Sequence, residues 1–283
     1  MGKLKLENVF YIYSPDTPFE KEALHDVSIE FQDNRITGII GHTGSGKSTV
    51  AQLLNGLLRP TSGKVILDGK DIFEKGYDIT GVRFRVGLVF QYPEYQLFEE
   101  TVFKDIAFGP SNMNLPKEEI DRRVRAAAKF VGIDEDLFEK SPFELSGGQK
   151  RRVAIAGIMA MEPEIIVLDE PAAGLDPRGR DEIFNGIKNW QQSHNATVIL
   201  ISHSMEDMAL YADDIVVMSE GGVLCSGSVD EVFCKTDLIE KSGLALPQIT
   251  AITDKLTDMG LISKKGIYTV EEAYLNIKKA IEA

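Results

Sequence analysis

The chain has 283 residues, of which 43% are hydrophobic and 27% charged, and its formal net charge is −13. This composition is ordinary for a soluble globular protein, and the length suffices for one large α/β domain with a small appendage. The acidic balance excludes a general nucleic-acid binder, which needs a clustered basic surface, but it allows a pocket with local positive charge.

Strand patterns dominate the first third of the chain. We predict strands over 4–13, 23–31 and 35–40, a helix beginning near Lys47, a hairpin over 64–72 and a buried strand over 86–90. From about residue 93 to 161 the pattern becomes helical, and apolar side chains recur at helical spacing at Ile120, Val124, Ala127 and Val131.

Strand patterns return over 165–168 and 197–202, on either side of a helix predicted over 178–193. Strands that alternate with helices predict a mostly parallel sheet covered on both faces. A hairpin is predicted over 214–226, around Glu220-Gly221-Gly222, and Ser228 with Glu231 forms a capping box that opens a short helix.

The tail from about residue 236 is predicted to be a separate helical unit. Apolar side chains form two helical stripes, one of Ile249, Ile252, Leu256 and Met259, the other of Val270, Tyr274, Ile277 and Ile281. Thr269 and Glu272 are a capping box for the second helix. Periodicity alone supports a self-contained helical cap and an interaction surface equally.

The two cysteines, Cys225 and Cys234, have no metal-ligand spacing, which predicts a reducing compartment without a disulfide framework. The first ten residues lack a secretory signal, and the apolar runs are far shorter than a membrane span. We therefore expect a cytoplasmic chain that reaches a membrane only through a partner.

Residues 41–48, Gly-His-Thr-Gly-Ser-Gly-Lys-Ser, match the phosphate-loop pattern between a predicted strand and a predicted helix. The glycines let successive N–H groups point at phosphate oxygens, and the helix N-terminus adds positive potential. Lys47 is predicted to neutralise the β- and γ-phosphates, and the Ser48 hydroxyl to ligate Mg²⁺. The predicted ATP-binding residues of this loop are Gly41, His42, Thr43, Gly44, Ser45, Gly46, Lys47, Ser48 and Thr49.

The apolar run 165–168, which follows Glu164, ends in two acids, Asp169 and Glu170. A buried strand delivers such carboxylates to the carboxyl edge of the sheet, where phosphates bind. Asp169 is predicted to hold Mg²⁺, directly or through water, and Glu170 to orient or deprotonate the attacking water. Acids often end strands, so this pair is weak by itself.

Residues 145–149 indicate the class of nucleotide-binding protein. Leu145, Ser146, Gly147, Gly148 and Gln149 resemble the signature of ATP-binding cassette (ABC) ATPases. A helix N-terminus with a small hydroxyl cap is an anion site. In the family, this serine and these glycines grip the γ-phosphate held by the opposite subunit, which implies that two cassettes close face to face around ATP.

Other landmarks of that family follow in order. Gln91 resembles the Q-loop glutamine, a catalytic residue that senses Mg²⁺ and the attacking water. Residues 173–176, ending in Asp176, resemble the D-loop that crosses the dimer interface, and His203 resembles the switch histidine that contacts the γ-phosphate. Tyr13 resembles the aromatic residue that stacks on adenine, with Tyr11 as the alternative.

The family implies an α/β P-loop NTPase fold with a mixed sheet core. The expected division is an ABC ATPase domain at 1–235, with an inserted α-helical subdomain at about 93–161, and a small C-terminal helical interaction domain at 236–283. A soluble cassette of DNA repair is disfavoured because 48–145 contains no long coiled coil. A translation factor with two cassettes and basic regions, and a phosphate-loop kinase, which would lack the signature, are disfavoured as well.

Within the family, residues 91–102 and 105–110 resemble the ATPase of energy-coupling factor importers, the A-component. Residues 172–177 and 246–250 are similar to the second, A-prime type of the vitamin importers, and a cobalt or nickel importer is the alternative. The implied partners are a second cassette, identical or homologous, an integral membrane T-component with coupling helices and, indirectly, a substrate-binding S-component, with no nucleic acid. The implied location is the cytoplasmic face of the cell membrane.

Residues 92–98 have two possible roles. Their aromatic and apolar side chains could pack into the helical subdomain itself, or they could dock coupling helices of the membrane partner. The resemblance favours docking. Glu94, Glu99 and Glu100 are then candidates to pair with an arginine of that partner.

Overall fold

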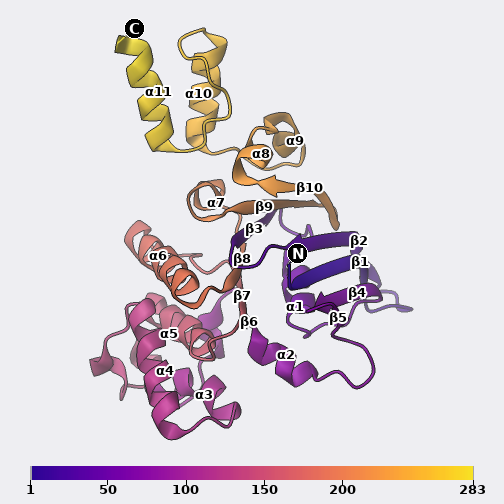
Figure 1. Ribbon diagram of the computed structural model, residues 1–283, viewed down its shortest axis with the longest axis vertical. Helices are drawn as coiled ribbons and strands as arrows, with labels where there is room; N and C mark the ends of the chain where they lie inside the picture. The colour runs from indigo at the N-terminus through magenta and orange to yellow at the C-terminus, as the bar shows by residue number, and fades with distance from the viewer. Residues whose placement is uncertain (1, 283) are drawn as a thin grey trace.

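The computed structural model describes residues 2–282 and combines two sheets, a group of helices and a terminal helical hairpin (Figure 1). The smaller sheet is antiparallel, and its strands in spatial order are β2 (Lys21–Phe31), β1 (Leu4–Tyr13), β4 (Ser62–Leu67) and β5 (Lys70–Asp71). The strands predicted in this region are present. Every second residue is buried at the start of β1, at Leu4 and Leu6, and at the end of β2, at Val27, Ile29 and Phe31, as a sheet with one solvated face requires.

The larger sheet has six strands. In spatial order they are β10 (Gly222–Ser228), β9 (Asp214–Ser219), β3 (Ile36–Gly41), β8 (Thr197–Ile201), β7 (Ile165–Asp169) and β6 (Val86–Val89). All neighbours are parallel except β9 and β10, which form the predicted hairpin. The predicted mixed-sheet α/β fold is therefore confirmed.

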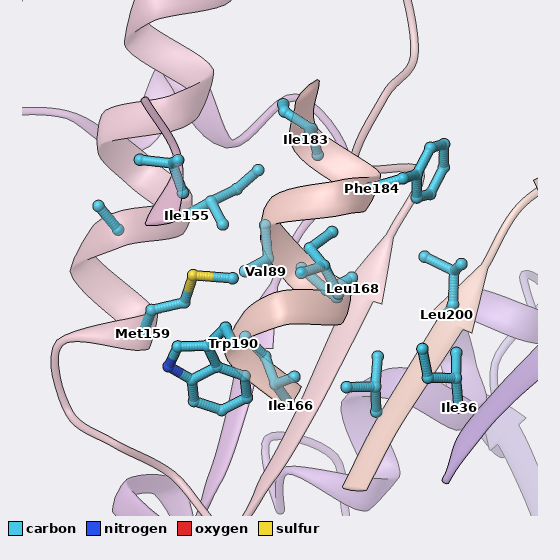
Figure 2. Packing of buried hydrophobic residues seen from close by; sticks show 14 of the residues in the cluster. Ile36, Val89, Ile155, Met159, Ile166, Leu168, Ile183, Phe184, Trp190 and Leu200 are labelled. Atoms are coloured by element: carbon cyan, nitrogen blue, oxygen red, sulfur yellow. The ribbon is translucent and has the colours of Figure 1, made fainter. Parts of the chain in front are cut away.

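Both faces of this sheet are covered, which explains why its strands read as continuous apolar runs. On one face, alternate strand residues pack with α1 (Lys47–Leu54) and the smaller sheet. On the other face, Ile166, Leu168 and Leu200 meet α5 (Gly147–Met159) and α6 (Pro177–His194), whose Met159 and Trp190 lie against the strands (Figure 2). The sheet is thereby fixed as a rigid support for the loops at its ends.

Helices α3 (Val102–Asn112), α4 (Lys117–Phe130) and α5 lie together in the region predicted to be helical (Figure 1). A short 3₁₀ helix, η1 (Pro93–Gln96), precedes them and packs against α5. Two short helices were not predicted, α2 (Ile79–Arg85) and α7 (Met205–Tyr211). Each spans two turns, which is too short for a helical period to stand out from the surrounding sequence.

The tail contains α8 (Val229–Phe233), α9 (Thr236–Lys241), α10 (Gln248–Asp258) and α11 (Val270–Glu282). Ile239 of α9 is buried in the main core, whereas α10 and α11 share a small separate cluster around Ile262, Ile267 and Ala273. Figure 1 shows α10 and α11 side by side at one end of the molecule. The domain boundary near residue 235 stays a prediction.

Candidate nucleotide site

The order of strands in the larger sheet brings most of the predicted site together. Four adjacent parallel strands, β3, β8, β7 and β6, point their carboxyl ends to the same edge. β3 leads into the phosphate loop at Gly41, and β8 leads to His203. β7 ends at Asp169, which Glu170 follows, and β6 leads to Gln91. Neighbouring strands lie about 4.8 Å apart, so segments distant in sequence meet at this edge.

The phosphate loop wraps tightly from β3 to α1. Gly46 has a φ of 100°, a conformation that side chains disfavour, and a Cβ there would lie 2.5 Å from Leu24 Cδ2. At Gly41 a Cβ would lie 2.4 Å from the Met218 carbonyl oxygen. Glycine is therefore required at both positions. The loop delivers the first N–H groups of α1, which have no partners within the helix, to the sheet edge.

Lys47 lies over this loop. Its ammonium group donates to the carbonyl oxygens of Gly41 at 2.8 Å and His42 at 3.0 Å. Burial lowers the pKa of Lys47, because desolvation disfavours its charged form, while the nearby Glu170 and Asp169 carboxylates act in the opposite direction. An anion bound beside this ammonium group would favour the charged form.

Asp169 ends β7 with its side chain buried. Burial raises the pKa of its carboxyl group, and a hydrogen bond from Ser48 opposes the rise. The structure thus brings together two of the three side chains predicted to hold Mg²⁺, Ser48 and Asp169, and leaves Gln91 exposed. Mg²⁺ in nucleotide sites is usually held by one or two protein groups together with phosphate oxygens and water. Ser48 and Asp169 match this small number of protein ligands. Within residues 2–282 no group of three or more His, Cys, Asp or Glu is placed to hold a metal ion.

Glu170 and His203 are in direct contact. Glu170 has a left-handed backbone conformation, with φ 53°, and its N–H donates to the carbonyl oxygen of Ile201 at 2.9 Å. Its carboxylate Oε1 lies 2.8 Å from His203 Nδ1. Both residues line a cavity of about 160 Å³ at this edge. A carboxylate and an imidazole therefore face one small volume, where either could accept a proton from a water molecule within hydrogen-bond reach.

The two candidate tyrosines lie in different surroundings. Tyr13 is 37% exposed, donates to or accepts from Thr49 Oγ1 at 3.1 Å, and lines a cavity of about 170 Å³ with Lys47 and Ser48. Tyr11 packs edge-on against the Tyr13 ring, at 4.7 Å between centroids, and against the core. Lys21 and Ala23 line the same cavity. No sequence motif indicated them, because only the β1–β2 pairing places them there.

The signature segment lies apart from these cavities. Ser146 caps α5, where its hydroxyl accepts from the Gln149 N–H at 3.3 Å and the Gln149 side chain accepts from the Ser146 N–H at 3.0 Å. Ser146 and Gly147 are exposed. Among the described residues, those that line the Lys47 and Glu170 cavities include none from 145–149. One chain therefore does not bring its own signature to its own phosphate loop.

The D-loop follows Glu170 directly. Ala173 donates its N–H to the Glu170 carbonyl oxygen at 3.2 Å, and Asp176 caps α6 by accepting from the Gly179 N–H at 2.7 Å. Asp176 and Gln91 are exposed. These two predicted residues thus lie at the surface, outside the two cavities described above.

This fold, with a phosphate loop and a capped signature helix, defines a nucleotide-binding cassette. The model of the family described as ABC transporter matches residues 24–173. The energy-coupling factor transporter ATP-binding protein EcfA2 of Clostridium acetobutylicum is 54% identical over 281 residues, covering 99% of this chain and 98% of that protein. The EcfA2 protein of Streptococcus pyogenes is 49% identical, covering 95% and 96%. The chain belongs to the ABC transporter family and, within it, to the energy-coupling factor transporter ATP-binding proteins.

Solved structures of similar proteins support the same family. The chain resembles cbiO1 of Clostridium perfringens, part of the ABC transporter complex cbiONQ, with a TM-score of 0.75 and 41% identity over 89% of this chain and 99% of that one. It also resembles the dimeric cassette MJ0796 bound to ADP and Pi, with a TM-score of 0.73 and 27% identity over 80% and 98%. The family resemblance and the fold class inferred from the sequence are confirmed.

Proposed function

We propose that this chain is the ATP-hydrolysing subunit of an energy-coupling factor importer for vitamins or other micronutrients. The observation that carries the proposal is the position of Gln91. Gln91 follows β6 at the sheet edge that holds the phosphate loop. The chain continues from Gln91 into residues 92–98, where Tyr95 is 85% and Phe98 59% exposed. ATP chemistry and a partner surface thus share one loop.

The residues of the site have different roles in the chemistry. Lys47 and the N–H groups at the start of α1 bind the β- and γ-phosphates, and Tyr13 stacks on adenine. Ser48, Asp169 and Gln91 would hold Mg²⁺, which would neutralise charge on the phosphates. Glu170 accepts a proton from the attacking water and His203 orients the γ-phosphate. Binding of Mg-ATP is supported by the Asp169 to Ser48 contact and by the loop geometry.

Hydrolysis requires a second cassette, identical or homologous. The exposed Ser146 and Gly147 at the N-terminus of α5 are suited to bind the γ-phosphate held by the opposite chain. The tail supports the same assembly as a C-terminal interaction domain. Of its predicted stripes, Val270, Tyr274 and Ile281 are at least 61% exposed, whereas Ile277 is partly buried. These faces fit a partner surface rather than a self-contained cap.

The membrane partner docks on residues 92–98. Beside this segment lies a mostly apolar groove of about 370 Å³, lined by residues of α2, α3 and α5 together with Leu97 and Phe98. Such a groove suits a short helix presented by a T-component. None of the helices within residues 2–282 is long and apolar enough to span a bilayer. The S-component is reached indirectly, and the complex places the chain at the cytoplasmic face of the membrane.

The acids expected to meet an arginine of the partner, Glu94, Glu99 and Glu100, differ in their contacts within the chain. Glu94 pairs with Arg151 at 2.9 Å and Glu100 pairs with Lys104, so both already have partners within the chain. Asp105 lines the groove instead, where burial raises the pKa of its carboxyl group and the N–H groups of Phe98 and Glu99 oppose the rise. Its position in α3 gave no signal in the sequence, because only the fold turns it toward the groove.

Replacing Tyr95 and Phe98 together with alanine tests the docking surface. Both rings are exposed, so the chain should still fold and bind ATP, while its recovery with membrane proteins in mild detergent should fall about tenfold or more. The matched control is Tyr95→Phe with Phe98→Tyr, which keeps both rings and should assemble. Normal assembly and uptake in the alanine variant would place docking elsewhere.

A further inference from the structure

Arg151 is a buried charge whose partners lie in two other segments of the chain. Its side chain is only 4% exposed, although it lies two residues beyond the signature on α5. A buried guanidinium group is costly unless its donors are satisfied, so its contacts show what it is built to hold.

The contacts of Arg151 join η1 to the D-loop. Nε donates to Glu94 Oε2 at 3.1 Å and Nη2 donates to Glu94 Oε1 at 2.9 Å, which is the two-pronged geometry that guanidinium and carboxylate groups favour. Nη1 donates to the carbonyl oxygen of Ala173. One planar group therefore holds the docking segment, the signature helix and the D-loop at once.

The rigid plane of the guanidinium makes these contacts mutually dependent. Because its donors are fixed relative to one another, a shift of Glu94 that keeps both hydrogen bonds must also move the donor that faces Ala173. The Ala173 N–H in turn donates to the Glu170 carbonyl oxygen at 3.2 Å. A continuous series of polar contacts thus runs from the exposed aromatic segment to the residue that faces His203.

We propose that Arg151 is a positioning residue that transmits occupation of residues 92–98 to the D-loop and hence to Glu170. The proposal rests on the docking role proposed above for that segment. In this arrangement the membrane partner changes the rate of hydrolysis by moving Glu94, and Arg151 carries that displacement to Ala173. Arg151 itself touches neither ATP nor the partner.

Arg152 provides the comparison that separates transmission from simple stabilisation of α5. It is the next residue on the same helix, with a side chain 19% exposed, and it pairs with Glu182 of α6 at 2.6 Å. An arginine-to-lysine exchange there keeps the charge and removes one Nη2 contact to Glu182. No hydrogen bond or ion pair found within residues 2–282 joins Arg152 to residues 92–98 or to the carbonyl of Ala173.

The experiment compares Arg151→Lys with Arg152→Lys in the full chain, both alone and in the detergent-solubilised complex of membrane proteins that co-purify with it. Lysine keeps the charge but cannot span Glu94 and the Ala173 carbonyl with one rigid plane. We expect the ratio of ATPase rates, complex over isolated chain, to fall about tenfold in Arg151→Lys and to stay unchanged in Arg152→Lys. ATP affinity and the thermal midpoint should be alike in the two variants.

Glu94→Gln completes a double-mutant cycle. If Arg151 and Glu94 act as one connection, the double variant should lose no more of the rate ratio than Arg151→Lys alone. An assembled Arg151→Lys complex with the wild-type ratio would overturn the proposal, and so would a complex that fails to assemble, because Arg151 would then serve docking. Failure of the docking proposal is distinct, since it shows as normal assembly without the Tyr95 and Phe98 rings.

Discussion

Replacing Glu170 with glutamine is expected to reduce ATP hydrolysis by about 100-fold to 10,000-fold while ATP still binds. The amide keeps the size of the side chain and a hydrogen bond to His203, but it cannot accept a proton from water. The carboxylate of Glu170 lies 2.8 Å from His203 Nδ1 at the cavity that both residues line, so the loss is chemical rather than steric. ATPase rate and ATP affinity, measured on the same preparation, check this expectation.

Because the dimer closes but cannot reopen through hydrolysis, this variant should also accumulate as ATP-dependent dimers in size-exclusion chromatography. Glu162→Gln is the matched control. It makes the same exchange at another left-handed position, with φ 51°, in the turn between α5 and β7. Near-normal ATPase activity in a properly assembled Glu170→Gln protein would remove this residue from the mechanism.

Replacing Ser146 with arginine is expected to lower ATPase activity about 100-fold, as loss of a positioned donor at a developing charge does. The long side chain would occupy the space where the phosphate of the opposite cassette approaches the N-terminus of α5. ATP should still bind to the variant chain, because its own Lys47 and α1 are untouched. ATP-dependent dimerisation, followed by light scattering, should be lost.

The cost of removing a helix cap must be separated from this effect. Ser146 and Ser228 both form capping boxes, and losing either cap should cost about 1 kcal/mol of stability. Ser228→Arg therefore imposes the same kind of folding cost at α8, away from the signature. A Ser146→Arg chain that dimerises and hydrolyses ATP as well as Ser228→Arg would contradict a site shared between two chains.

The phosphate loop, the acids after β7 and the signature could be predicted because each is contiguous in sequence and each needs particular residue types. The order of the strands could be anticipated only as an alternation of strand and helix. That β8 lies between β3 and β7, which brings His203 to Glu170, is decided by packing of both sheet faces. The family resemblance gave each residue a role near the γ-phosphate, but the contact between the two side chains comes from the structure.

The contacts that could not be predicted join residues distant in sequence and ordinary in type. Glu94 and Arg151 are 57 positions apart, and surface acids and bases usually stay solvated. The side chains that fill the core of the tail could not be predicted either. Its helical periods are correct, but Ile252 is 53% and Met259 71% exposed, because Ile262 and Ile267 from the connecting segment fill the small core instead.

The small size of that core has a consequence for local stability. The cluster between α10 and α11 contains three buried apolar residues, Ile262, Ile267 and Ala273, whereas β7 and β8 are buried along their whole length. Helices with little buried apolar surface open at a lower free energy than the strands of a core. Amide hydrogens of α10 and α11 therefore exchange with deuterated water well before those of β7. A partner surface that covers Val270 and Tyr274 slows this exchange. The exchange rate of the tail therefore shows whether such a partner is bound.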